Sequence, residues 1–340
     1  MKSKVKWKLC LSDSFNVLNG IKQGGVISPI LFSLYIDKLI ELVHSSNFGC
    51  YIGDVPSSIF IYADDIVLLS PTRYGMKQIL RLCEEFGVEY GLKFNPDKCE
   101  SVTYSNTNNL NDKLMFELNG KSIKFVENVK HLGHDLISKK CKFNFEPILN
   151  DIKSKTNGIL NVFNHISIDA RLRLFNSFCT SYYGSILCSL NDLDKIDVVW
   201  RVCVRRILKV NSRTRSYLLP ALTNMRSAKS EIEKRMLLFF IDGLNHDSEI
   251  VEFYFRNCLC NESSTMYKNV KNLTVNNDMF LNRLKFYSKN FIKTLFKNTS
   301  IKDWRSNMVM EMLKILDGDF IIDNFDISDL KNIFYYLCTY

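Results

Sequence analysis

The stretch FIYADDIVLL, residues 60–69, places two adjacent aspartates inside a run of aromatic, β-branched and aliphatic residues. Such residues suit the pleated, covered surface of a β-strand. Aspartate is rarely buried unless a partner neutralises its charge. A tight turn between two strands can present both carboxylates at one edge of a sheet. We therefore predict a β-hairpin with Asp64 and Asp65 at or beside its turn.

Two carboxylates at the edge of a hairpin can hold a hard divalent cation. Mg²⁺ prefers oxygen ligands, often one or two carboxylates together with phosphate oxygens. Two such ions can activate an attacking hydroxyl and stabilise a leaving pyrophosphate during phosphoryl transfer. Apolar surroundings make the charges costly unless a cation neutralises them, which gives the pair a reason to lie there. The alternative is a solvated Asp-Asp turn in an ordinary hairpin, because aspartate is a common turn residue.

The composition narrows the class of protein. A length of 340 residues with 46% hydrophobic residues is enough for two folded domains. The sequence contains no apolar stretch of about 18 residues, so we expect no membrane partner. The basic N-terminus lacks the apolar region of a secretion signal, so we expect an intracellular protein, nuclear or cytoplasmic. The formal net charge of +9 favours a polyanionic partner.

The eleven cysteines indicate reduced thiols. They are odd in number and mostly isolated, and no export signal precedes them. A zinc site would need two close Cys/His pairs. Neither Cys258 with Cys260 nor His131 with His134 has a second pair nearby, so we do not expect zinc.

Helix signals occur on both sides of the Asp-Asp stretch. Ser28-Pro29 predicts a helix start, with Ser28 as the N-cap and Pro29 at the first helical position. Apolar residues at helical spacing predict helices over residues 29–45 and 74–90. Gly91 is a typical stop signal for the second of these helices.

Strand signals continue to about residue 140 and then fade. Short strands are expected at 93–94 and 99–104, around an Asn-Pro-Asp turn, and Asn119-Gly120 predicts a hairpin. After residue 144 the apolar pattern is helical, except that the polar segment 261–277 indicates a linker or long loop. The expected fold class is α+β, followed by an all-helical part.

Four sequence blocks follow one another across residues 16–137. They are GIKQGGVISPILFSLYID (20–37), YADD (62–65), YGLKFNPDKCE (90–100) and VKHLGHDL (129–136). In order and spacing these blocks resemble the signature of reverse transcriptases from non-LTR, LINE-type retrotransposons. The resemblance implies an RNA-directed DNA polymerase that uses an RNA template, a DNA primer, dNTPs and Mg²⁺. It leaves the oligomeric state open.

The resemblance also implies roles for individual residues. Asp64 and Asp65 would be catalytic metal ligands, with Asp65 the weaker of the two. Lys98 would assist the departure of pyrophosphate, although a lone lysine after a turn is otherwise a solvated charge. His134 is more readily structural. The other implied contacts are with nucleotide or template for Gln23, Gly24, Tyr62 and Ala63, and with the primer, as a primer grip, for Leu132 and Gly133.

The same resemblance divides the chain into regions. Residues 1–140 would form a partial polymerase palm, an antiparallel sheet with helices on one face. Residues 141–260 would form a helical, thumb-like region. Residues 278–340 would form a C-terminal helical region.

A basic stretch, RVCVRRILKVNSRTR at residues 201–215, contains six cationic residues and no acidic one. On a helix, Arg201, Arg205 and Lys209 share one face because they lie four residues apart. With Arg206 they are candidates for contacts with a nucleic-acid backbone, since phosphate contacts supply most sequence-independent affinity. A solvated helix face is the alternative.

A further carboxylate that would bridge two metal ions is not found where the family has it. The family places this carboxylate several tens of residues before the Gln-Gly block. Only nineteen residues precede Gly20, and Asp13 is their sole aspartate. We therefore expect an incomplete site and little or no polymerase activity from this chain alone. The alternatives are a non-catalytic nucleic-acid-binding remnant and a palm-like scaffold, against which the retained YADD argues.

Overall fold

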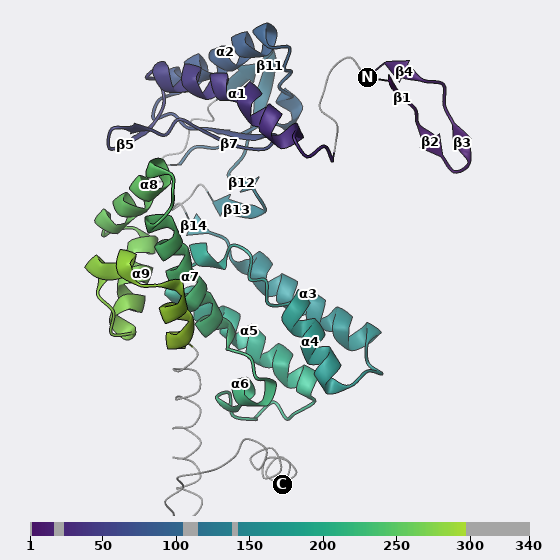
Figure 1. Ribbon diagram of the computed structural model, residues 1–340, viewed down its shortest axis with the longest axis vertical. Helices are drawn as coiled ribbons and strands as arrows, with labels where there is room; N and C mark the ends of the chain where they lie inside the picture. Colours follow the sequence, from purple (N-terminus) through teal and green to yellow (C-terminus); the bar gives the residue numbers. More distant parts are fainter. Residues whose placement is uncertain (1, 17–23, 105–114, 138–141, 297–340) are drawn as a thin grey trace, which may run out of the picture. The chain divides into compact units, whose positions relative to one another are not determined.

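The computed structural model describes residues 2–16, 24–104, 115–137 and 142–296 (Figure 1). The chain divides into two units, Met1–Val129 and Lys130–Tyr340. Strands and helices alternate in the first unit, whereas the described part of the second is helical after its first strands. The fold class is α+β with a following helical part, as the sequence predicts.

The strands of the first unit form short, mostly antiparallel pairs. β7 (Ile59–Tyr62) pairs with β8 (Asp65–Leu68), and β10 (Phe116–Leu118) pairs with β11 (Lys121–Phe125). β9 (Glu100–Ser101) runs parallel to β11. The remaining pairs are β1 (Lys2–Ser3) with β4 (Phe15–Asn16), β2 (Lys6–Trp7) with β3 (Cys10–Leu11), and β5 (Tyr51–Ile52) with β6 (Val55–Pro56).

The turn between β10 and β11 confirms the predicted hairpin at Asn119-Gly120. Both residues have positive φ, +52° and +72°, as a two-residue turn of type I′ requires. The strand expected at 93–94 is wrong, and only β9 forms within 99–104. The Leu92 N–H donates to the Gly87 carbonyl (2.9 Å), which keeps this segment against the preceding helix.

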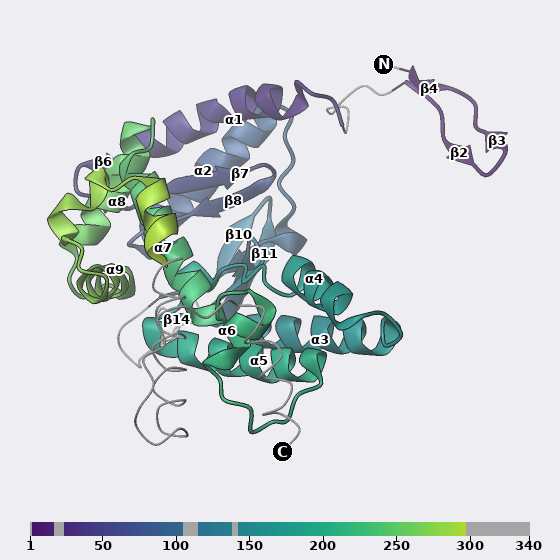
Figure 2. The ribbon, with the colours of Figure 1, turned by 60° about the horizontal axis from the view of Figure 1, so that its bottom comes forward.

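Helices α1 (Ser28–Ser45) and α2 (Arg73–Glu89) lie on one face of the β7–β8 hairpin (Figure 2), close to the predicted ranges. Their apolar faces and Ile59 of β7 form one core, whose other buried members are Ile36, Leu39, Val43, Ile79, Cys83 and Phe86. A second cluster joins Leu80 of α2 to β10 and β11. The hairpin is thus supported from one side by packed helices.

One of the two predicted helix-end signals, the stop at Gly91, is confirmed, and the other, the N-cap at Ser28, is not. Gly91 follows the C-cap of α2 with φ +66°, as predicted. The N-cap of α1 is Ile27, so the N-cap role predicted for Ser28 is wrong by one residue. The reason is that the chain already turns before it: the Ser28 N–H donates to the Gly25 carbonyl (3.2 Å), and Ser28 enters the helix. Pro29 lies in the first turn.

A small sheet of β12 (Asn128–His131), β13 (His134–Ile137) and β14 (Lys142–Phe143) precedes the helices of the second unit. Those helices are α3 (Glu146–Val162), α4 (Ile168–Phe178), α5 (Leu190–Leu208), α6 (Leu218–Thr223), α7 (Ala228–Leu244), α8 (Glu249–Cys260) and α9 (Thr265–Asn276), with the 3-10 helices η2 (Ser185–Leu187) and η3 (Leu281–Phe286). Residues 289–296 are also helical. The core of this unit includes Phe175 of α4, Trp200 of α5 and Phe240 of α7.

The linker predicted at 261–277 is wrong, because α9 occupies most of this segment. The helix buries Tyr267, Val270 and Leu273, which recur every third residue. Asn269 is buried with them. The segment is polar in composition, but its few apolar side chains share one face, and that face packs on α7 and α8.

None of the helices in the described part of the chain combines the length and the apolar composition needed to cross a membrane.

Candidate active site

The predicted Asp-Asp hairpin is confirmed. β7 and β8 pair from Ile59 opposite Leu68 to Tyr62 opposite Asp65, so Ala63 and Asp64 form a two-residue turn. Ala63 has a φ of +52°, in the left-handed region that costs a residue with a Cβ about 1–2 kcal/mol. The tight turn is the reason that both carboxylates lie at one end of the hairpin.

The two faces of the hairpin differ in exposure. Ile59 is buried and Ile61 is half-buried against the helices. Tyr62 and Asp65 are cross-strand partners on the opposite face, and Tyr62 is 67% exposed. Both carboxylates are exposed as well, so in this chain they are not enclosed by apolar residues as the sequence suggested. Water reaches both of them.

The donor chemistry of the pair fits Mg²⁺, because carboxylate oxygens are hard ligands and one or two of them, with phosphate oxygens and water, are its usual set in proteins. The number of donors is small. Within the described ranges, no group of three or more His, Cys, Asp or Glu side chains is placed to hold a metal ion. The described residues therefore offer two candidate carboxylates at this turn and no group of three.

Only part of the loop predicted to contact the nucleotide is described. Gly24 has a φ of +77°, and a Cβ built on it would meet no atom within 4 Å. Among the described residues, none therefore crowds Gly24, and glycine adopts its positive φ without strain. Gln23 lies outside the described residues.

Lys98 is the last residue of the 3-10 helix η1 (Pro96–Lys98) and is exposed. The Asn95 side chain caps this helix by accepting the Asp97 N–H (3.0 Å). Asp97 also pairs with Lys121 of β11 at 3.2 Å. The turn that carries Lys98 is thus fixed by a side-chain cap and an ion pair, and Lys98 itself is exposed.

Leu132 and Gly133 form the turn between β12 and β13, with φ of +46° and +78°. The Tyr183 hydroxyl donates to the Leu132 carbonyl at 2.9 Å. The Tyr183 ring stacks on the His134 imidazole, with centroids 4.6 Å apart and planes at 16°. Sequence reasoning did not single out Tyr183, since nothing in the local sequence links it to a turn 51 residues away.

The basic stretch lies at the end of α5 and in the loop after it. Arg205 donates to the Thr214 carbonyl (3.1 and 2.8 Å) and to the Ser216 hydroxyl (2.8 Å). Arg201 pairs with Asp197 at 3.3 Å, and Arg206 donates to Asn157 at 2.8 Å. Lys209 is the C-cap, with φ of +57°, so the helical face expected for 201, 205 and 209 ends at Leu208.

The guanidinium groups of Arg201, Arg205 and Arg206 thus bond to other residues of the same unit. Arg205 is half-buried, and its hydrogen bonds close the loop that follows α5. Arg206 and Lys209 are exposed. A contact with a nucleic-acid backbone stays a prediction for this stretch, and of the four candidates Arg206 and Lys209 are the exposed ones.

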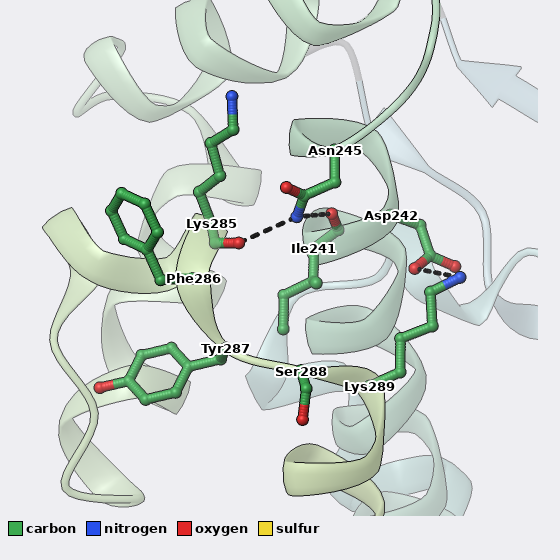
Figure 3. Close-up of a pocket in the computed structure, with 8 residues that line it drawn as sticks. All are labelled: Ile241, Asp242, Asn245, Lys285, Phe286, Tyr287, Ser288 and Lys289. Atoms are coloured by element: carbon green, nitrogen blue, oxygen red, sulfur yellow. Dashed lines mark hydrogen bonds and ion pairs between the residues drawn. The ribbon is translucent and has the colours of Figure 1, made fainter.

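A surface pocket of about 340 Å³ lies within the second unit, between α7 and the segment 285–289 (Figure 3). The Asn245 amide donates to the Ile241 carbonyl (2.9 Å) and to the Lys285 carbonyl (3.0 Å) across it. Lys289 pairs with Asp242 at 2.8 Å at its rim. None of the residues predicted to contact substrate lines this pocket.

An α+β unit that presents neighbouring carboxylates at a hairpin turn has the architecture of a polymerase palm. Residues 3–136 match the family described as "Reverse transcriptase (RNA-dependent DNA polymerase)". This family generally uses divalent metal ions. The fold and the turn of the first unit are therefore those of the segment that matches the reverse transcriptase family.

Several curated proteins are similar to the chain. The "Retrovirus-related Pol polyprotein from type-2 retrotransposable element R2DM" of Drosophila melanogaster is 38% identical over 91 residues, 27% of this chain and 8% of that protein. The R2 polyprotein of Nasonia vitripennis is 34% identical over 83 residues, 24% of this chain and 8% of that protein. The "RNA-directed DNA polymerase from mobile element jockey" of Drosophila funebris is 23% identical over 215 residues, 58% of this chain and 23% of that protein.

These matches support the resemblance that the sequence predicts: residues 3–136 match the reverse transcriptase family, and the similar curated proteins are polyproteins or polymerases of non-LTR retrotransposons. The chain spans less than a quarter of the length of these relatives.

Proposed function

We propose that the chain takes part in RNA-templated DNA synthesis by a non-LTR retrotransposon, with Asp64 and Asp65 as ligands of Mg²⁺. The observation that carries this proposal is the exposed turn of the β7–β8 hairpin, which lies inside the segment matched to the reverse transcriptase family. Exposure of both carboxylates leaves them accessible to a metal ion and a nucleotide.

Other residues have supporting roles in this proposal. Mg²⁺, when bound with a nucleotide, stabilises charge on the transferring phosphates. Lys98 is exposed and would contact the pyrophosphate. Gln23, Gly24, Tyr62 and Ala63 would contact the nucleotide or template, and Leu132 with Gly133 would contact the primer strand.

The second unit would bind the phosphate backbone through the basic end of α5. Arg206 and Lys209 are exposed and lie within three residues of each other. The formal charge of the chain, +9, attracts a nucleic acid from a distance. Arg201 and Arg205 would contribute charge while their side chains also hold the local structure.

A second candidate is binding of nucleic acid without catalysis by this chain alone. It is favoured by the small number of ligands, since the described residues contain no third metal-ligating side chain beside the pair. A bridging carboxylate is needed for two-metal chemistry.

Primer extension separates the two candidates. The full chain is incubated with an RNA template, a labelled DNA primer, dNTPs and Mg²⁺, and the matched variants are Asp64→Asn, Asp65→Asn and Asp97→Asn. Extension by wild type and Asp97→Asn, lost in Asp64→Asn and reduced in Asp65→Asn, supports the polymerase. Binding without extension by any of them supports the second candidate, and absence of binding contradicts both.

Binding is measured by filter retention over a salt series. The double substitution Arg206→Ala with Lys209→Ala is expected to weaken binding to all sequences and to flatten the salt slope by roughly one unit per lost phosphate contact. The control is Lys268→Ala, an exposed lysine of α9. An unchanged slope in the double variant would place the nucleic-acid surface elsewhere.

A further inference from the structure

The turn between β12 and β13 is held by one side chain from a distant loop of the same unit. Tyr183 donates its hydroxyl hydrogen to the Leu132 carbonyl at 2.9 Å. Its ring stacks on His134 at 4.6 Å. A Cβ added to Gly133 would lie 3.2 Å from Tyr183 Cε1, which is closer than most side chains tolerate. Tyr183 therefore lies against both residues of the turn and against His134, the first residue of β13.

Burial does not explain the position of Tyr183. Its side chain is 63% exposed, so little apolar area is gained by placing the ring there. An exposed side chain ordinarily keeps its rotamer freedom, and ordering it has an entropic cost. The contacts with the turn are what order this ring.

The loop that carries Tyr183 is itself fixed from α7. Tyr182 is buried to 4% exposure although its φ is +46°, so the surrounding fold imposes a conformation that is unfavourable by about 1–2 kcal/mol. Arg235 of α7 donates to the carbonyls of Thr180 (3.1 Å) and Ser181. Its guanidinium lies 5.4 Å from the centre of the Tyr182 ring.

Arg235 is in turn oriented by its own helix. Its Nε donates to Glu231 at 3.0 Å, one turn earlier in α7. Glu231 also pairs with Arg226 at 3.3 Å. A continuous series of contacts thus runs from α7 through Arg235 and the loop to Tyr183 and the turn.

The His134 imidazole is suited to stacking on the Tyr183 ring. Burial, and to a lesser extent the nearby His131, lower the pKa of His134, which favours the neutral imidazole. A neutral imidazole stacks on the phenol ring without placing a charge in a partly buried site.

We propose that Tyr183 is a positioning residue that holds the Leu132–Gly133 turn in the shape in which it contacts the primer strand. Arg235 fixes the loop that presents Tyr183. This inference rests on the proposed function, in which this turn contacts the primer. The hydroxyl fixes the backbone of the turn, and the ring supports His134.

The geometric half of the proposal is tested by NMR on the full chain without nucleic acid. Tyr183→Phe keeps the ring and removes the hydroxyl, Tyr183→Ala removes both, and Phe178→Ala is the control at an exposed aromatic of α4. Tyr183→Phe is expected to leave the ring-current shift of His134 unchanged and to speed amide exchange of Gly133 by about fivefold. Tyr183→Ala is expected to abolish the ring-current shift.

The functional half uses a DNA primer with 2-aminopurine at its 3′ end, annealed to an RNA template. Tyr183→Ala is expected to lose most of the fluorescence change on binding while Kd stays within about twofold, because backbone contacts supply the affinity. Tyr183→Phe should retain an intermediate change. Phe178→Ala should match wild type.

The outcomes separate this inference from the proposed function. Wild-type binding with an unchanged primer-end signal in Tyr183→Ala would overturn the positioning role while leaving nucleic-acid binding intact. His134 shifts and Gly133 exchange that match wild type in Tyr183→Ala would overturn it as well. If wild type binds no nucleic acid, the proposed function fails together with the primer-positioning role, and the NMR result still decides whether Tyr183 holds the turn.

Discussion

Replacing Asn269 by leucine is expected to destabilise the second unit strongly. The Asn269 side chain is buried in α9, and its amide bridges the chain at the start of α5. Nδ2 donates to the Cys188 carbonyl at 2.7 Å. Oδ1 accepts the N–H of Leu190, the first residue of α5, at 3.2 Å. That N–H is one of the donors that a helix cannot satisfy internally.

The magnitude follows from these two bonds. A leucine side chain can form neither bond, so the Leu190 N–H and the Cys188 carbonyl lose their partner inside the fold. Each unsatisfied group costs about 1–3 kcal/mol of stability. The added apolar contacts of leucine offset about 1 kcal/mol of this loss. The net decrease in the free energy of unfolding is about 1–5 kcal/mol. For a unit of this size that lowers Tm by roughly 2–20 °C.

Calorimetry and urea denaturation of the full chain measure this change. The matched control is Asn272→Leu, one turn further along the same helix, where the asparagine is exposed. The control should stay within about 0.5 kcal/mol of wild type. If Asn269→Leu unfolded at the same urea concentration as the control, the amide bridge would contribute nothing and the reasoning would be refuted.

Three further changes have defined outcomes. Ala63→Gly removes the strain of a positive φ at the turn and should raise the free energy of unfolding of the first unit by about 1 kcal/mol. Urea denaturation measures this change, and a decrease would contradict the positive φ at Ala63. Gly49→Ala introduces a Cβ that overlaps the buried Ser58 side chain, so urea denaturation should show a loss of about 1–3 kcal/mol. Burial raises the pKa of Glu233 to about 7, so its ionisation opposes folding and stability is lost as pH rises through that value. The free energy of unfolding of Glu233→Gln, measured by thermal melts, should therefore exceed that of wild type by about 1–3 kcal/mol at pH 8. This difference should shrink towards pH 5.

The sequence by itself determined the local elements of the first unit. The hairpin at Asp64-Asp65, the turn at Asn119-Gly120 and the stop at Gly91 each depend on a few neighbouring residues and on the φ values that those residues accept. The order of the four blocks was enough to predict the resemblance to reverse transcriptases that the match over residues 3–136 supports. These features could be predicted because their causes lie within a turn or two of the chain.

Tertiary structure alone decided how polar side chains are used. Asn269 lies in a segment whose composition indicated a linker. It is buried because the Leu190 N–H at the start of α5 and the Cys188 carbonyl just before that helix, 79 and 81 residues away, bond to its amide. Arg205 fitted a phosphate-binding face, and the fold engages it with the Thr214 carbonyl. Tyr183 meets its turn across 51 residues. A polar group can be satisfied by water, by a ligand or by distant backbone, and only the packed fold determines which of these partners it meets.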